Sequence, residues 1–378
     1  MRFHRRSKET RKPSIPKPSS TSSPTLKPLG SSTLADEKKN FRREQLFLSL
    51  ITAPVVDLEK IRSVSWAGVP DKFRATVWRL FLDYEPVNST IRESTLQHKR
   101  TDYFDCVDRV FSQPQRHLWT NSQKQTESQI LRDLPRTSNA LLRTERVMLI
   151  FTRILFTWSV RHPASGYVQG MNDLLRPFFF VFLADKREGD VSKVEHLENL
   201  DEFSDDIMKE IEADCFWCFS KLLDGLQDLY TKDQPGLYKM LDSLQVVIER
   251  VDPTLANHIK EEDIQYQEFA FRWMNCLLVR EFSTALIFRL WDSYLSNHHK
   301  ISYTHVYTCA ALLTKMSDTL SVASHSDFVI QIQSIDPEQW TVADMDEIIA
   351  QAYVYERMFS QAQSHLRSAS LPSFNSLQ

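Results

Sequence analysis

Glycine is unusually scarce in this chain. Only seven of the 378 residues are glycine, far below the usual share of about 7%. Turn-rich β architectures need glycine at positions of positive φ, so this scarcity favours a helical protein. The glycines are also too far apart to form GxGxxG, or GxxxxGK followed by Ser or Thr. The sequence therefore has no recognisable phosphate-binding loop, and we expect no nucleotide binding by the chain alone.

Hydrophobic periodicity predicts helices along most of the chain. Residues 145–162 are apolar almost all round, which predicts a central, buried helix that stops at Pro163. In 214–230 the apolar residues recur every three or four positions, as on one face of a helix. Further helices are expected at 268–282, 283–295, 303–316 and 345–359. We find no β-alternation and no internal repeat of about 30–45 residues, which argues against a helical-repeat scaffold.

The two ends of the chain differ from its middle. We assign residues 1–40 to a disordered, basic tail, because Ser, Thr and Pro supply 17 of the first 35 positions. This tail is either simply solvated, or phosphorylated, or attracted to acidic lipid headgroups. Residues 361–378 are rich in Ser and Gln and are expected to form a flexible C-terminal tail.

Charge is distributed unevenly along the sequence. Residues 1–35 hold eight Lys and Arg against one Glu, a net +7; the whole chain carries −3, so the remainder carries −10. A folded part with that balance is a poor binder of nucleic acid, which needs a basic face. Residues 185–214 hold twelve acidic and four basic side chains. They predict a mobile acidic loop, either simply solvated or a specificity element that meets a basic partner.

Cysteines and apolar runs indicate the compartment. Five cysteines, an odd number, are typical of reduced thiols in the cytosol. Cys215 and Cys218 form one CxxC without a second metal-binding pair, so we expect buried core thiols, with metal or redox chemistry as the alternative. The apolar run 177–184 is shorter than the about 20 residues that span a bilayer, so no transmembrane segment is expected. Neither end has a lipidation motif. We expect a cytoplasmic protein whose membrane association, if any, is peripheral.

A first polar segment stands out at 130–137, with the sequence Ile-Leu-Arg-Asp-Leu-Pro-Arg-Thr. Pro135 disfavours helical backbone at the residue before it, so we expect an extended loop from which Arg136 projects. Thr137 and Ser138 can then cap the helix that follows. From the residues alone, a capping loop with an exposed arginine would explain this segment without any function.

A second polar segment follows the expected central helix at 167–173, with the sequence Tyr-Val-Gln-Gly-Met-Asn-Asp. Gly170 predicts a turn in this segment. Its ordinary explanation is a glycine turn next to a buried Gln169 that satisfies backbone groups. Neither segment, taken alone, identifies a function.

Together, these segments resemble the two signature motifs of the TBC domain family of Rab GTPase-activating proteins, IxxDxxR and YxQG. The matching residues are Ile130, Asp133 and Arg136 in the first motif, and Tyr167, Gln169 and Gly170 in the second. Further matches are Trp-Ala-Gly-Val-Pro at 66–70 with Arg74 and Trp78, and the segments 272–282 and 289–295. The resemblance covers about residues 60–360, which we assign to one TBC (Rab GAP) domain. Segment 161–174 is similar to the fungal branch whose best-known member acts on a Golgi Rab.

This resemblance implies an all-α fold of two packed helical subdomains that form a V-shaped groove for the GTPase. It implies an enzyme activator in vesicle-mediated transport, one that accelerates GTP hydrolysis by a GTP-bound Rab-family GTPase. GTP and magnesium would be carried by that partner, so the chain itself would need no cofactor and no metal. Any peripheral membrane association would be expected at the Golgi, through the Rab or the basic tail.

The resemblance also implies roles for individual residues. Arg136 would be an arginine finger that neutralises charge on the phosphoryl oxygens, and Gln169 would orient the attacking water. Asp133 would hold the first segment, 130–137 (the arginine loop), by accepting hydrogen bonds from its backbone or guanidinium. Tyr167 and Asn172 would brace the second segment, 167–173 (the glutamine loop). The remaining supporting residues are Thr137, Gly170 and Arg74.

Two other interpretations stay open. A TBC-like domain could bind a Rab without accelerating hydrolysis; loss of either finger would favour that, but both Arg136 and Gln169 are present. A structural scaffold would leave the motifs as loops without a catalytic role, and the missing repeat argues against it. An enzyme with its own small-molecule chemistry is disfavoured because neither GxSxG nor HExxH occurs.

Overall fold

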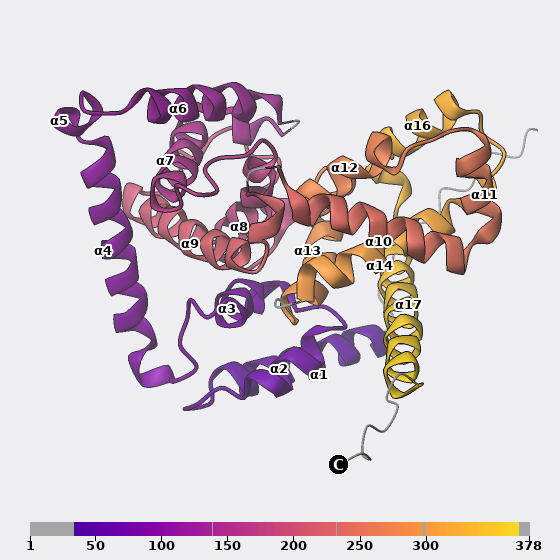
Figure 1. Cartoon of the computed structure of the whole chain (residues 1–378). Coiled ribbons are helices and arrows are strands. Elements are labelled where there is room, and N and C mark those ends of the chain that lie inside the picture. Colours follow the sequence, from indigo (N-terminus) through magenta and orange to yellow (C-terminus); the bar gives the residue numbers. More distant parts are fainter. Residues whose placement is uncertain (1–33, 138, 232, 298–299, 370–378) are drawn as a thin grey trace, which may run out of the picture. The chain divides into compact units, whose positions relative to one another are not determined.

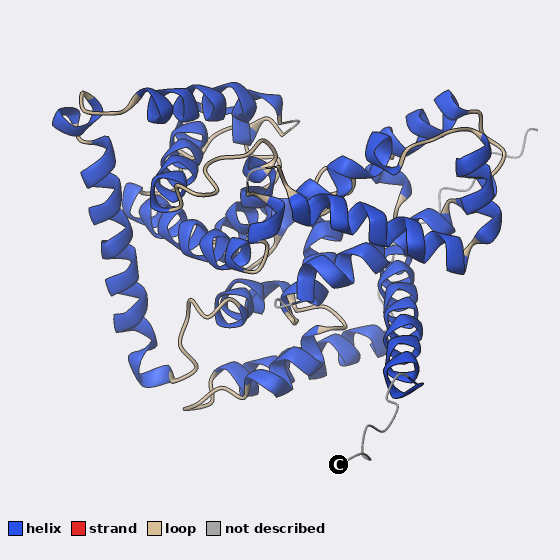
Figure 2. Cartoon of the chain, viewed as in Figure 1, coloured by secondary structure: helices blue, strands red, loops and turns tan. Residues whose placement is uncertain are grey.

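The computed structural model describes residues 34–137, 139–231, 233–297 and 300–369. Every regular element in these ranges is a helix, and the β pairing is limited to one isolated bridge between Val55 and Asn88 (Figure 2). The all-α prediction is therefore confirmed. The chain divides into two units, Met1–Arg42 and Arg43–Gln378, and the packing described below is that of the second.

The helices follow one another with short connections. The α-helices are α1 (Leu34–Ile51), α2 (Leu58–Ser65), α3 (Asp71–Phe81), α4 (Arg92–Phe111), α5 (Gln113–Arg116), α6 (Asn121–Asp133), α7 (Glu145–Arg161), α8 (Met171–Asp185), α9 (Asp205–Asp224), α10 (Pro235–Val251), α11 (Pro253–Glu261), α12 (Tyr266–Cys276), α13 (Thr284–Leu295), α14 (Ile301–Lys315), α15 (Ser317–Leu320), α16 (His325–Gln333) and α17 (Val342–Ala369). Single 3-10 turns are η1 (Ser89–Ile91), η2 (Leu134–Arg136), η3 (Leu141–Arg143), η4 (Val191–Lys193), η5 (Gln227–Leu229) and η7 (Pro337–Gln339).

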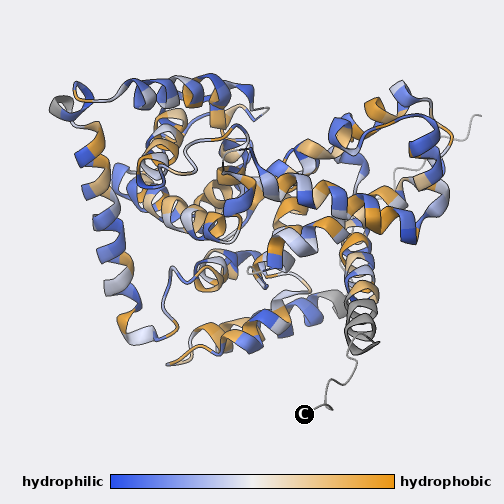
Figure 3. Ribbon diagram, viewed as in Figure 1, coloured by the Kyte–Doolittle hydropathy of each residue, from blue (hydrophilic) through white to orange (hydrophobic). Residues whose placement is uncertain are grey.

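Helix α8 is the centre of the first subdomain. It packs against α3, α7 and α9, while α4 covers α7 and α9, and α6 covers α7 (Figure 1). The run Phe178–Phe180 of α8 is fully buried, and α7 is buried along most of its length. Outer helices such as α4 instead carry hydrophilic and hydrophobic residues side by side (Figure 3). The central helix predicted at 145–162 is thus confirmed as α7.

Helix α10 is the centre of the second subdomain, where it packs against α11, α12 and α14, and α14 packs against α17. The two subdomains meet where α8 contacts α12 and α13, and where α3 contacts α13. At this junction Trp78, Phe178 and Trp291 form a buried aromatic cluster with ring centroids 5.5, 5.9 and 6.0 Å apart. The prediction of two packed helical subdomains is confirmed, whereas the V-shaped groove stays a prediction.

Several boundaries differ from those expected. The helix expected at 214–230 is α9, which begins at Asp205 and ends at Asp224. Leu226 directly precedes η5, and Leu229 is its last residue. Ser204 caps α9 and two aspartates occupy its first turn, both of which favour a helix start. The acidic loop predicted at 185–214 is therefore wrong for residues 205–214. The helix expected at 268–282 ends at Cys276, where the next residue has positive φ.

The predicted tails are shorter than expected. Residues 34–40 were assigned to the N-terminal tail, but they form the start of α1, because Ala, Glu and Lys are strong helix formers. Likewise, α17 continues through residues 361–369, which are rich in Gln and Ala. The rest of both predicted tails, residues 1–33 and 370–378, lies outside the described residues. Among the residues that are described, no helix is both long and apolar enough to cross a membrane.

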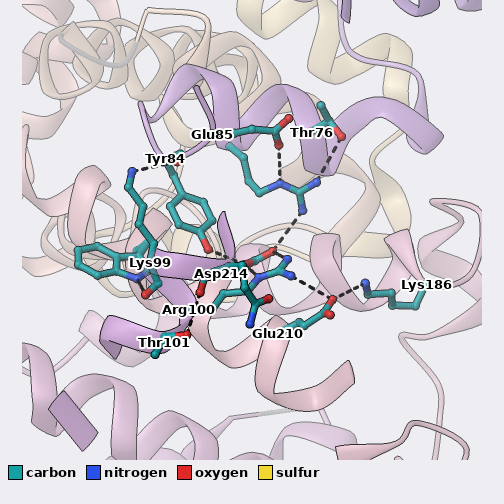
Figure 4. A network of polar contacts seen from close by, with 12 residues as sticks. Thr76, Tyr84, Glu85, Lys99, Arg100, Thr101, Lys186, Glu210 and Asp214 are labelled. Carbon is teal, nitrogen blue, oxygen red and sulfur yellow. Dashed lines mark hydrogen bonds and ion pairs between the residues drawn. The ribbon is translucent and has the colours of Figure 1, made fainter. Parts of the chain in front are cut away.

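Two buried features of α9 tie it to its neighbours. Cys215 and Cys218 are both inaccessible to solvent, and burial raises the pKa of each thiol, so the prediction of core thiols is confirmed. Asp214 accepts hydrogen bonds from Arg79 of α3 at 3.3 Å and from Arg100 of α4 at 2.9 and 3.0 Å (Figure 4). This carboxylate therefore fastens three helices of the first subdomain together.

Candidate functional site

The arginine segment continues helix α6 and is not the extended loop that the sequence predicts. After Asp133 the chain enters η2, which ends at Arg136. Pro135 occupies the first turn of η2, where its missing N–H breaks no hydrogen bond. Leu134 adopts helical backbone (φ −56°, ψ −44°) because its burial outweighs the bias that a following proline imposes. The extended-loop prediction is therefore wrong up to Arg136; only Thr137 is extended (φ −69°, ψ 144°).

Arg136 ends this turn with its side chain toward solvent. The side chain is 59% exposed, in agreement with the prediction that it projects. Its Nη1 lies 3.2 Å from Oδ1 of Asp133, whose own side chain is buried. The guanidinium is thus held at one edge by a fixed carboxylate, while the rest of it faces outward.

Tyr167 connects the second segment to the same carboxylate. Its buried hydroxyl lies 3.1 Å from Oδ2 of Asp133 and 3.3 Å from Oδ1 of Asn172. Both oxygens are acceptors, so the single hydroxyl proton is donated to one of them at a time. Burial and the charge of Asp133 raise the pKa of Tyr167, which keeps this donor protonated at neutral pH. The two sequence motifs therefore meet at one carboxylate, with Arg136 on one oxygen and Tyr167 on the other.

Gln169 lies two residues after Tyr167, immediately before α8. It is exposed, so its interpretation as a buried glutamine is wrong. Its backbone carbonyl accepts a hydrogen bond of 2.8 Å from Nδ2 of Asn275. Its side-chain amide makes no hydrogen bond to any residue that the structure describes. The amide is therefore free to bind a group that another molecule supplies.

Glycine at position 170 is required by two features at once. It is the N-cap of α8 and has φ +102°, a left-handed conformation that side chains rarely adopt. A Cβ there would also collide with Nδ2 of Asn275. Three residues on, Asp173 accepts a hydrogen bond of 2.8 Å from Nε of Arg280. Burial raises the pKa of Asp173, and Arg280 opposes this effect.

Arg74 belongs to a different cluster. Its Nε lies 3.1 Å from Oδ1 of Asp292, a buried carboxylate that also accepts from Val69 N at 2.7 Å and from Trp78 Nε1 at 2.8 Å. The opening motif at 66–78 and the segment 289–295 therefore meet at Asp292. No described hydrogen bond or ion pair joins Arg74 to either of the two loops, so its contacts are those of a structural residue.

Thr137 does not cap a helix as the sequence predicts. The helical turn that follows, η3, has Ala140 at its N-cap, and Asn139 Oδ1 accepts from Leu142 N at 3.3 Å in its place. The second predicted cap, Ser138, lies outside the described residues.

Sequence reasoning missed the residues of α12 and its C-terminal turn that contact the glutamine loop, Asn275, Cys276 and Arg280. All three lie in the segment 272–282 that carries part of the family resemblance. The signal that could have identified Asn275 is a single amide in the apolar run Trp-Met-Asn-Cys-Leu-Leu. A buried polar side chain in such a run needs a partner.

The two motifs offer hydrogen-bond donors at the surface, since Arg136 and Gln169 are exposed. A cleft of about 690 Å³ is lined by α10, α14 and η5, and neither Arg136 nor Gln169 lines it. In the described ranges, no cluster of three or more His, Cys, Asp and Glu side chains is placed to hold a metal. What the two loops can do chemically is donate hydrogen bonds and positive charge to an anionic group on another molecule.

Comparison with known sequences places this geometry in a family. A model of the Rab-GTPase-TBC domain matches residues 71–320. The chain is 40% identical over 331 residues to TBC1 domain family member 22B of Homo sapiens, covering 86% of this chain and 63% of that protein. It is 36% identical over 342 residues to GTPase-activating protein gyp1 of Schizosaccharomyces pombe, covering 88% and 65%. The chain thus spans less than two thirds of the length of these relatives.

Solved structures agree with the sequence relatives. The Ypt/Rab-GAP domain of Gyp1p superposes with a TM-score of 0.79 at 35% identity, covering 84% of this chain and 99% of that domain. The Chlamydomonas flagellar RabGAP TBC domain has a TM-score of 0.57 at 17% identity, over 84% and 91% of the two chains, which shows a shared fold. From the domain match, the identity and the common fold, this chain belongs to the Rab-GTPase-TBC domain family.

Proposed function

We propose that this chain is a GTPase-activating protein that accelerates GTP hydrolysis by GTP-bound Rab-type GTPases. Family membership supports the reaction, as does the similarity to the GTPase-activating protein gyp1 of Schizosaccharomyces pombe. The observation that supports it most directly is the shared carboxylate of Asp133. It bonds to both Arg136 and Tyr167, so the arginine turn and the glutamine loop lie together.

Arg136 is the proposed arginine finger. Free GTPases of this kind hydrolyse GTP slowly because charge that develops on the phosphoryl oxygens is not neutralised. An arginine supplied in trans accelerates hydrolysis by about 10³ to 10⁵. The guanidinium suits this role because it bridges two oxygens at once, which an ammonium group cannot do. Its exposure and its single carboxylate partner leave N–H donors available for that contact.

Gln169 is the proposed glutamine finger. An amide can accept a hydrogen bond from the attacking water and donate one in return, which fixes the direction of attack. The exposed, unbonded amide of Gln169 is suited to this task. The proposed supporting residues are Asp133 and Tyr167, which connect the two loops, with Asn172 as the second acceptor for Tyr167.

GTP and magnesium belong to the partner GTPase in this proposal, and the chain contributes side chains only. Action at Golgi membranes, reached through the Rab, remains the proposed location.

The test is single-turnover GTP hydrolysis by a panel of Rab GTPases. We expect the wild-type chain to accelerate at least one of them, and Arg136→Ala and Gln169→Ala to lose most of that acceleration while remaining folded. Arg109→Ala is a matched control, because Arg109 is an exposed arginine on α4 that contacts neither loop. It should leave the rate unchanged.

The alternative is a domain that binds a Rab without activating it. Binding of GTP-loaded Rabs without acceleration by the wild-type chain would favour that alternative. Binding of none would favour a structural scaffold.

A further inference from the structure

The C-terminal end of α12, in the second subdomain, contacts the glutamine loop. The side chain of Asn275 is buried and donates from Nδ2 to the carbonyl oxygen of Gln169 at 2.8 Å. The other end of the same residue is also fixed, because its backbone carbonyl accepts from the hydroxyl of Tyr230 at 2.6 Å. The hydrogen bond from Asn275 to Gln169 thus joins residues 106 positions apart. It connects α12 to the segment just before α8.

The polar groups of Asn275 are incompletely satisfied. Its Oδ1 is buried without a hydrogen-bond partner among the described residues. An unpaired buried acceptor destabilises a fold. An aliphatic side chain in this apolar run would avoid that cost, so the presence of the amide points to a role for its donor group.

The backbone after Asn275 is strained in a way that also points to this contact. Leu277 and Leu278 have φ of +49° and +62°, and both are buried. Left-handed backbone is unfavourable at a non-glycine residue, and such strain persists where the surroundings require it. The turn ends α12 directly after Cys276 and brings Arg280 back toward Asp173.

Loop and helix fit each other closely. Gly170 has no side chain, and any Cβ would collide with the Asn275 amide. On the far side of the glycine, Asp173 accepts from Arg280 and, at 3.5 Å, from Sγ of Cys276. The backbone that carries Gln169 is therefore held before α8 by Asn275 and inside α8 by Arg280.

We propose that Asn275 is a positioning residue, which sets the orientation of Gln169 by holding its backbone carbonyl. This inference rests on the proposed catalytic role of Gln169. The Gln169 amide has no partner of its own among the described residues, so the direction of its side chain depends on where its backbone lies. A misplacement of about 1 Å in a catalytic group can lower a rate about 100-fold.

The test is a double-mutant cycle, measured as single-turnover hydrolysis over a range of activator concentrations. The GTPase is the Rab that the wild-type chain accelerates most. We expect Asn275→Ala to lower the maximal rate by about 10- to 100-fold, with a half-saturating concentration within about twofold of wild type. In the Gln169→Ala background, the same substitution should change the maximal rate by less than about twofold, because the side chain that Asn275 orients is already absent.

A matched control separates positioning from general destabilisation. Trp217→Phe removes a side-chain to main-chain hydrogen bond of the same length, 2.8 Å from Nε1 to the carbonyl of Lys99, between α9 and α4. It should lower the midpoint of urea unfolding slightly and leave the maximal rate unchanged.

Each outcome decides between explanations. An equal loss for Asn275→Ala in the presence and absence of Gln169 would overturn the positioning role, as would a loss confined to the half-saturating concentration. If Gln169→Ala itself retains full acceleration, the proposed function of Gln169 fails first, and this result is distinct from the cycle.

A second variant covers the case in which Asn275→Ala does not fold. Asn275→Ser is smaller and retains a donor, and it should recover part of the maximal rate relative to Asn275→Ala if both fold. If neither folds, Gly170→Ala disturbs the same contact from the loop, because its Cβ would collide with the Asn275 amide. It should lower the maximal rate only when Gln169 is present. A Gly170→Ala protein with the wild-type maximal rate would overturn the proposal.

Discussion

Asp214 and Asp133 are two of the carboxylates that bind arginines in this domain, and their arginines differ in exposure and in the number of partners. Asp214 is buried and accepts from Arg79, Arg100 and the hydroxyl of Tyr84, at 2.7 Å for the last (Figure 4). Asp133 is also buried, but it accepts from one arginine, Arg136, and one tyrosine, Tyr167. The side chain of Arg79 is 11% exposed, whereas that of Arg136 is 59% exposed.

The difference lies in how many donors each guanidinium has left. Arg79 also bonds to Glu85 at 2.8 Å. Burial disfavours its charge, but Asp214 and Glu85 outweigh burial, so the pKa of Arg79 lies above its ordinary value. Arg136 has one ion pair, on one nitrogen. A guanidinium surrounded by carboxylates contributes to structure, while one held at a single edge can bind an anion from another molecule.

The largest effect expected from this comparison is on catalysis. Arg136→Ala should lower the acceleration of a responsive Rab by about 10³-fold or more. Arg136→Lys should recover little of it, because a point charge cannot bridge two oxygens. Neither variant should change the midpoint of urea unfolding much, since the Arg136 side chain is exposed and the buried Asp133 keeps its hydrogen bond from Tyr167. A large loss of stability in Arg136→Ala would mean that Arg136 is structural after all, and the comparison would fail.

The next largest effect is on stability and follows from replacing Asp214. Asp214→Ala leaves Arg79 and Arg100 without their shared partner, and breaking a buried ion pair in this way costs about 3–5 kcal/mol. We expect the midpoint of urea unfolding to fall accordingly. At a temperature where the variant is still folded, acceleration per folded molecule should equal that of wild type. A variant that is stable but inactive would contradict the assignment of this cluster to structure.

Hydrophobic patterns in the sequence predict the buried helices of the fold and miss the polar ones. Residues 145–162 are apolar on all sides, and α7 is correspondingly buried. Helix α6 is mostly polar, and our periodicity analysis missed it. A capping box between Thr120 and Gln123 helps to start it. The early end of α12 was not predictable either, because Leu277 in left-handed backbone is a tertiary effect.

The candidate site was predictable only in part for a similar reason. Motif resemblance identified Arg136, Gln169 and Asp133, and the structure brings Asp133 to both loops through Arg136 and Tyr167. Asn275 lies 106 positions from its partner, and a single sequence carries no signal for such a pair. The resemblance equally could not separate Arg74, which lies in a structural cluster, from residues beside the loops.

The burial of His305 should produce a smaller, pH-dependent effect on the free energy of unfolding. His305 is fully buried between Tyr294 and the carbonyl of Trp273, and burial lowers its pKa from 6.5 to about 4. Between these values the unfolded chain binds the proton and the folded chain does not. Stability is therefore lost as pH falls from 6.5 toward 4, by about 3 kcal/mol in total.

The measurement is urea unfolding against pH for wild type and His305→Gln, because the difference between the two curves cancels the other titrating groups. We expect that difference to be constant above pH 7 and to change below 6.5 in favour of the variant. Parallel curves would show that His305 does not titrate as its burial implies, and acid sensitivity would then have to come from the ion-paired clusters.

The smallest effect compares the two tyrosines that donate to the two carboxylates. Tyr84→Phe and Tyr167→Phe each remove one hydroxyl and little volume, and each leaves a buried aspartate with its arginine. One such hydrogen bond contributes about 0.5–1.5 kcal/mol. At Asp214 we expect this as lost stability without lost activity. At Asp133 we expect the loss of the hydrogen bond to appear chiefly as a fall in the maximal rate of about 3- to 10-fold. The reason is that the hydroxyl of Tyr167 joins the glutamine loop to the arginine turn. If both variants lose stability and neither loses rate, the Asp133 cluster is structural like the Asp214 cluster, and the position of Gln169 then depends on α12 rather than on Tyr167.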